Sequence, residues 1–109
     1  MAIPYKRSSG LITAAALVWS GPCYYFGFVC EPGGDDQTID IYDSNGATGL
    51  QVENFTADGD KTTDGHSHSM PVFCATGLYI NPSGGTTVVY YLPLDECAGV
   101  VLKPAEFRG

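Results

Sequence analysis

Basic residues are scarce in this chain, and its central part has almost none. Of the 109 residues only five are lysine or arginine, whereas twelve are aspartate or glutamate. Between residues 10 and 102 Lys61 is the single basic residue, and it stands against eleven acidic ones. A body of this charge repels the phosphates of nucleic acids. We therefore expect no direct binding to DNA or RNA.

The sequence also lacks an apolar run long enough to cross a bilayer. The run from Leu11 to Trp19 has about half of the roughly 20 residues that a membrane-spanning helix needs. Because Lys6 and Arg7 precede it, this run resembles the apolar segment of a signal peptide. Cleavage behind it, however, would cut into the aromatic segment 23–30. We expect no membrane segment and no export by the standard route.

Cysteine pairs at zinc-binding spacing are absent. Cys23, Cys30, Cys74 and Cys97 are separated by 6, 43 and 22 residues, and no Cys-x-x-Cys occurs. In strand-like surroundings we favour free, buried thiols over a structural disulfide. Cys23 and Cys30 are an odd number of positions apart, so in one regular strand they point to opposite faces and cannot pair with each other.

Catalytic motifs are missing as well. No serine lies in a Gly-x-Ser-x-Gly turn and no cysteine is visibly paired with a base. The acidic segment Asp58–Asp64 lacks the register of a calcium loop, and we interpret it as a solvated hairpin tip. We predict no catalytic residues, no cofactor and no enzymatic activity.

The segment His66-Ser67-His68 is the one metal-like pattern. In an extended segment its two imidazoles lie on one side, which suits a transition metal when another ligand converges on them. No cysteine or glutamate nearby in the sequence stands at ligand spacing. We therefore predict no metal site. An exposed loop edge, or one histidine from each subunit meeting on a symmetry axis, explains the pattern.

The chain does contain short β-prone runs, separated by turn residues about every ten positions, a spacing typical of sandwiches and barrels. In 38–43 the alternation places Ile39 and Ile41 inward. We predict an all-β fold, a small antiparallel β-sandwich. Its expected strands are Leu11–Ser20, Cys23–Glu31, Thr38–Asp43, Leu50–Ala57, Val72–Cys74, Gly77–Asn81 and Thr86–Leu92.

Two of these strands, 23–31 and 86–92, are apolar or aromatic on both faces. Strict alternation puts Tyr24, Phe26, Phe28 and Cys30 on one face of the first, and Tyr25, Gly27 and Val29 on the other. In so small a sandwich one apolar face is left over, and either a loop or another subunit covers it. For the second case we predict a subunit interface of Tyr25, Val89, Tyr90 and Tyr91.

The two ends differ from the acidic body, because they hold four of the five basic residues. We divide the chain into an N-terminal arm (1–10), a β-sandwich domain (11–92) and a C-terminal arm (93–109). The plain alternative is a pair of solvated termini on an acidic domain. As arms, the ends combine apolar anchors with charge, and we predict partner contacts by Ile3, Tyr5, Lys6, Arg7, Leu102, Lys103, Phe107 and Arg108.

The order of several short segments resembles that of small jelly-roll-like β-sandwich virion proteins of tailed bacteriophages, over about residues 11–92. The segments are 12–18, Ser20-Gly21-Pro22, Tyr25-Phe26-Gly27, 41–44, Ala47-Thr48-Gly49, 75–79 and 87–91. The chain departs from that pattern in its four cysteines, in His66-Ser67-His68 and in the extension from residue 93 onward.

The resemblance implies a jelly-roll-like sandwich on a phage particle, commonly a homotrimer, without catalytic residues. We expect a virion structural protein, assembled in the host cytoplasm. Its expected role is that of a head decoration (cement) protein that binds the major capsid protein, or another virion protein, and stabilises the shell. One alternative is a fibre or tail module that stacks host glycans on Tyr24, Tyr25, Tyr42, Tyr90 and Tyr91. Another is a secreted, disulfide-linked β domain.

Overall fold

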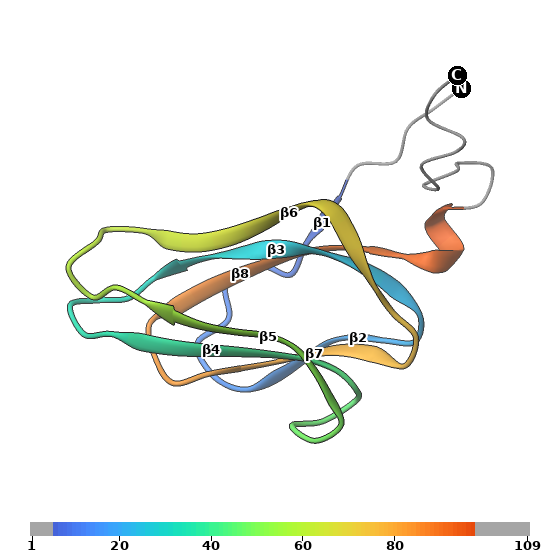
Figure 1. Ribbon diagram of the computed structural model, residues 1–109, viewed down its shortest axis with the longest axis horizontal. Coiled ribbons are helices and arrows are strands. Elements are labelled where there is room, and N and C mark those ends of the chain that lie inside the picture. The colour runs from blue at the N-terminus through green and yellow to red at the C-terminus, as the bar shows by residue number, and fades with distance from the viewer. Residues whose placement is uncertain (1–5, 98–109) are drawn as a thin grey trace.

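The computed structural model describes residues 6–97, apart from the side chains of residues 96 and 97, and it is an all-β fold (Figure 1). A short 3₁₀ helix, η1 (Leu94–Cys97), follows the last strand. No helix within residues 6–97 is long and apolar enough to cross a membrane. The strands are β1 (Arg7–Ser8), β2 (Ala16–Ser20), β3 (Cys23–Glu31), β4 (Gln37–Asp43), β5 (Leu50–Ala57), β6 (Asp64–Cys74), β7 (Gly77–Pro82) and β8 (Thr86–Pro93).

The strands form two four-stranded antiparallel sheets, one with the order β1-β8-β3-β6 and the other with the order β2-β7-β4-β5. Figure 1 shows the two sheets as two layers. The first strand pairs with the last, β2 with β7, β3 with β6 and β4 with β5. A long hairpin rolled up in this way is the jelly roll. The predicted jelly-roll-like β-sandwich is confirmed.

The core lies between the two sheets. Ile39 and Ile41 of β4 are fully buried, as the alternation predicted, and they lie in one apolar cluster with Phe28, Leu78 and Ile80. Burying apolar side chains of this size contributes about 1.5–3 kcal/mol each relative to exposure. The alternation in β4 therefore both identifies the strand and fixes which face is turned inward.

A β-bulge in β3 changes which side chains face the core. Its register with both neighbouring strands shifts between Tyr25 and Gly27. Before the shift Cys23 and Tyr25 are buried, and after it Phe28 and Cys30 are. An inserted residue moves the alternation by one position. The prediction that Tyr24, Phe26, Phe28 and Cys30 share one face is therefore wrong.

Gly27 makes this bulge possible. Its φ is +130°, and a Cβ atom there would lie 2.2 Å from the backbone oxygen of His66 on β6. Only glycine combines that backbone conformation with so close an approach. The bulge thus brings β6 close to β3 at His66 and Ser67.

Three strands differ from the prediction by more than one residue. Arg7 and Ser8 pair with Tyr91 and Tyr90, so the segment predicted as an N-terminal arm contains strand β1. β2 begins at Ala16 rather than at Leu11. β6 begins at Asp64, eight residues before the predicted start at Val72, because pairing with β3 extends through a polar stretch that carries no β signal of its own.

The predicted subunit-interface residues lie mainly inside the chain's own core. Tyr25 and Val89 are fully buried and Tyr91 is 6% exposed. This corrects the prediction for these three, because a core side chain offers no surface to a partner. Tyr90 is half-buried on the outer face. Six predicted arm contacts, Ile3, Tyr5, Leu102, Lys103, Phe107 and Arg108, lie outside the described residues.

The cysteines with described side chains are free and buried, as predicted: Cys23, Cys30 and Cys74. Cys23 and Cys74 lie directly opposite each other on β3 and β6, a pairing that the sequence did not reveal. Their hydrogen bond lowers the pKa of Cys23, and it raises the pKa of Cys74 together with burial.

Candidate metal centre

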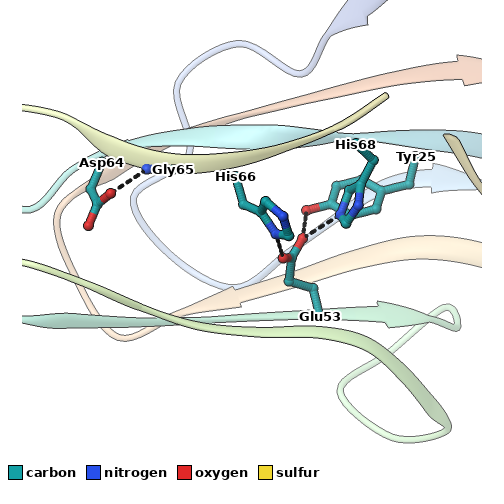
Figure 2. Close-up of polar contacts among 6 residues, drawn as sticks. All are labelled: Tyr25, Glu53, Asp64, Gly65, His66 and His68. Atoms are coloured by element: carbon teal, nitrogen blue, oxygen red, sulfur yellow. Dashed lines mark hydrogen bonds and ion pairs between the residues drawn. The ribbon is translucent and has the colours of Figure 1, made fainter. Parts of the chain in front are cut away.

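Two histidines and a glutamate meet where the two sheets face each other along one side of the sandwich. This side is formed by β5 and β6, the edge strands of the two sheets, which are joined by residues 58–63. Glu53 comes from β5, and His66 and His68 come from β6. Figure 2 shows the three side chains pointing toward one another, with the ring of Tyr25 from β3 beside them.

The local sequence explains why these side chains converge. His66 and His68 are two positions apart in a strand and so lie on the same face of the sheet. On β5, Glu53 is in phase with Phe55 and with the fully buried Ala57. Its carboxylate is therefore turned toward the opposite sheet rather than toward water.

Glu53 accepts hydrogen bonds from two strands of the opposite sheet, β3 and β6. The Tyr25 hydroxyl donates to Glu53 Oε1 over 2.6 Å, and His68 Nε2 lies 3.0 Å from the same oxygen. His66 Nδ1 contacts the other carboxylate oxygen, Oε2. One potential ligand atom from each of Glu53, His66 and His68 lies within 4.8 Å of the others.

The environment keeps the carboxylate ionised. The side chain of Glu53 is only 7% exposed, and this burial raises its pKa. The hydrogen bonds from Tyr25, His66 and His68 outweigh burial, so the pKa of Glu53 lies below its ordinary value. Burial, followed by the hydrogen bond to Glu53, raises the pKa of Tyr25. At neutral pH the cluster therefore holds a carboxylate anion beside a neutral phenol.

These donors are those of a transition-metal site. Two imidazole nitrogens and one carboxylate oxygen form a common ligand set for zinc, with a fourth position left for water or another ligand. The side chain of His66 is 49% exposed and that of His68 is 21% exposed, so solvent reaches the cluster from the His66 side. Tyr25 would hold the carboxylate from behind as an outer partner.

The structure changes the interpretation of His66-Ser67-His68. The segment lies in strand β6 rather than at a loop edge, and Glu53, 13 residues before His66, supplies the converging carboxylate that the sequence analysis did not find. The expectation of a loop edge without a converging ligand is therefore wrong. A signal was present, since Glu53 stands in phase with the apolar residues of a predicted strand, where a lone carboxylate needs a partner.

The tyrosines considered for glycan stacking separate into two groups. Tyr25 and Tyr91 lie in the core and offer no ring face to a sugar. Tyr24, Tyr42 and Tyr90 are half-buried.

Comparisons of the chain with protein-family models, with curated proteins and with solved structures found no match.

Proposed function

We propose that this protein is a structural protein of a tailed-bacteriophage particle, a capsid decoration (cement) protein that binds the major capsid protein and stabilises the shell. The order of its sequence segments supports this proposal, and so does the jelly-roll strand order. Jelly rolls occur in viral capsid proteins and in lectins. Because a fold alone does not define a function, the proposal rests mainly on where the described chain enters and leaves the sandwich.

Both ends of the described chain leave the sandwich at the same end of β8, and this observation carries the proposal. Arg7 of β1 pairs with Tyr91, and η1 begins at Leu94, three residues further along. The backbone N–H of Leu94 donates to the carbonyl of Pro22 over 3.0 Å, which fixes the start of η1. In Figure 1 β1 and η1 lie toward the same end of the molecule.

The opposite end of the sandwich is acidic. There β8 begins at Thr86, which pairs with Glu31. The connection after β3 (residues 32–36) contains two aspartates, and the connection between β5 and β6 (58–63) contains two more. Gly59 donates its backbone N–H to Asp36 Oδ1 over 2.8 Å, so these two connections lie side by side. An acidic end that faces away from the attachment point favours one orientation on a partner surface.

Two arms that start from one end can engage a partner together, which converts weak contacts into avidity. Extended arms can also add strands to exposed sheet edges. Lys6 and Arg7, the described basic residues of the N-terminal arm, lie over the rings of Phe26 and Trp19, at 5.1 and 5.6 Å from the ring centroids. These contacts direct the start of the arm along the sandwich.

For self-association we propose a homotrimer formed through the outer face of the β3, β6 and β8 sheet, where a second copy of the chain packs. Phe73 is 48% exposed and Val29 42% exposed, and the rings of Tyr24 and Phe73 lie 5.4 Å apart there. Sedimentation at micromolar concentration should show three chains. Val29→Asp on this face should give the monomer, whereas Thr63→Asp, in an exposed connection, should not.

The docking experiment is co-sedimentation of shortened chains with phage particles that lack the protein. Deleting residues 1–5, or 98–109, should weaken attachment at least tenfold without changing the melting temperature. Deleting residues 1–9 should also lower the melting temperature, because β1 and its pairing with β8 are lost. Attachment should weaken as salt screens exposed charges, over Debye lengths from about 8 to 3 Å.

Full-strength attachment by both shortened chains would refute docking through the ends. The sandwich surface would then have to make the contact.

A further inference from the structure

We infer that Glu53, His66 and His68 form a binding site for a divalent transition-metal ion of the zinc type, one that ties the two sheets together along the β5 and β6 side. The inference rests on the geometry of these side chains and does not depend on the proposed role on a phage particle. It differs from the absence of metal that the sequence alone predicted.

The spacing of the donor atoms fits such an ion after small movements. Zinc bonds to nitrogen and oxygen ligands of about 2.0–2.2 Å place neighbouring tetrahedral ligand atoms about 3.3 Å apart. His68 Nε2 already lies 3.0 Å from Glu53 Oε1, and the ligand atoms of all three residues lie within 4.8 Å of one another. Movements of about 1 Å at the tips of the side chains would therefore admit the ion.

The surroundings hold the three ligands in place. His66 is held on β6 by its pairing with Phe28 of β3, and His68 and the Tyr25 hydroxyl both hydrogen-bond to the carboxylate of Glu53. The imidazole of His66 stacks on the ring of Phe55, with ring centroids 6.2 Å apart and planes inclined by 23°. Outer partners of this kind orient metal ligands and raise affinity.

The donor types select the class of ion. Imidazole nitrogens favour zinc, nickel, cobalt and copper, whereas magnesium and calcium require oxygen ligands. The half-exposed His66 leaves a path by which an ion can reach the cluster from solvent. Without metal, the same residues satisfy one another through hydrogen bonds. When an ion binds, metal–ligand bonds take the place of the hydrogen bonds that join the two sheets here.

The test uses the full chain without a histidine tag, treated with chelator and titrated with zinc chloride. Calorimetry should give one ion per chain. At zinc concentrations a hundredfold above the dissociation constant, the melting temperature should rise by about 10 °C. Cobalt(II) should give the visible absorption of a four-coordinate ion. Magnesium and calcium at the same concentrations should leave the melting temperature unchanged.

Variants identify the ligands. His66→Ala, His68→Ala and Glu53→Gln should each weaken zinc binding at least a hundredfold. Two matched controls should bind like the unmodified chain: Ser67→Ala, between the two histidines, and Glu31→Gln, which makes the same charge change on an exposed residue.

Three results would overturn the inference. They are the absence of binding at 100-fold molar excess of zinc, equal affinity in Glu53→Gln, and equal binding of calcium. If Glu53→Gln fails to fold, His66→Ala still decides the matter, because that side chain is half-exposed and its removal leaves the hydrogen bonds of Tyr25 and His68 to Glu53 in place.

Discussion

The two open sides of the sandwich are closed in different ways. Along the β5 and β6 side, the buried carboxylate of Glu53 accepts hydrogen bonds from Tyr25, His66 and His68 of the opposite sheet. Along the β1 and β2 side the contacts are aromatic and cationic. There the ring of Trp19 lies 6.0 Å from that of Tyr91 in the opposite sheet, under the guanidinium of Arg7.

This difference separates two sources of stability. Closure by rings depends mainly on the apolar area removed from water, which changes little with pH. Closure by a carboxylate and two imidazoles depends on protonation and on metal ions. One side of the molecule should therefore respond to solution conditions, and the other should not.

The largest predicted effect on stability comes from Gly27→Ala. This substitution should separate β6 from β3 and disorder the β5 and β6 side of the sandwich. The added Cβ would lie 2.2 Å from the carbonyl oxygen of His66, and the residue would keep a φ of +130°. We expect a loss of about 4 kcal/mol in unfolding free energy, measured with denaturant.

Gly33→Ala is the matched control for Gly27→Ala. Gly33 also has a positive φ, +81°, but nothing lies within 4 Å of its would-be Cβ. It should lose only about 1–2 kcal/mol, the cost of the backbone conformation alone. Equal losses in the two variants would show that the close contact with His66 has no energetic weight.

Trp19→Ala should cause the next largest loss of stability, because it removes a ring that closes the β1 and β2 side of the sandwich. Removing a partly buried indole that packs on Tyr91 should cost about 3 kcal/mol. The loss should be the same at pH 7 and at pH 4. A loss that changed by more than about 1 kcal/mol between these pH values would contradict the assignment of pH sensitivity to the other side.

Glu53→Gln should cost about 2 kcal/mol at pH 7 in the presence of chelator, since hydrogen bonds to a charged acceptor are lost. The pKa of Glu53 is lowered in the folded state, so its contribution is present above the unfolded pKa of about 4.3 and is lost as pH falls through the folded pKa. The difference between the two proteins should therefore shrink below about pH 4.3. Urea titrations at pH 7, 5 and 3.5 measure it, and a constant difference would refute the charged role of Glu53.

The smallest effect should be a gain in stability. Thr87 is fully buried beside Ile12, and within residues 6–97 its Oγ1 has no hydrogen-bond partner. Thr87→Val keeps the shape and removes the unpaired hydroxyl, so it should stabilise the protein by about 1 kcal/mol. Thr86→Val, at a half-buried neighbour, should change stability by less than half as much. A destabilised Thr87→Val variant would mean that the hydroxyl has a partner.

Much of the fold could be predicted from local pattern. The alternation in 38–43 identified β4 and its inward face, and 23–31 and 50–57 matched β3 and β5 at both ends. The first eight residues of β6 could not be found in this way, because this mainly polar stretch becomes a strand only in its pairing with β3. The bulge at Gly27 was missed because alternation assumes an unbroken register.

The site was only half predictable. The spacing of His66 and His68 showed two imidazoles on one side of an extended segment. Their carboxylate partner lies on the other sheet, and only the jelly-roll strand order brings β5 opposite β6. The core positions of Tyr25 and Tyr91 were missed for a related reason: in strands that are apolar on both faces, composition does not say which face is turned inward.

The connection between β5 and β6 (58–63) is a suitable place to insert a foreign peptide. Its turn is closed by a local hydrogen bond from the Lys61 backbone to the carbonyl of Asp58, and Thr62 and Thr63 are exposed. It lies at the far end of the sandwich from β1 and η1. A foreign peptide inserted between Thr62 and Thr63 would lie at the opposite end of the sandwich from β1 and η1. If the protein attaches to a particle through its chain ends, each attached copy would display the inserted peptide on its outer side.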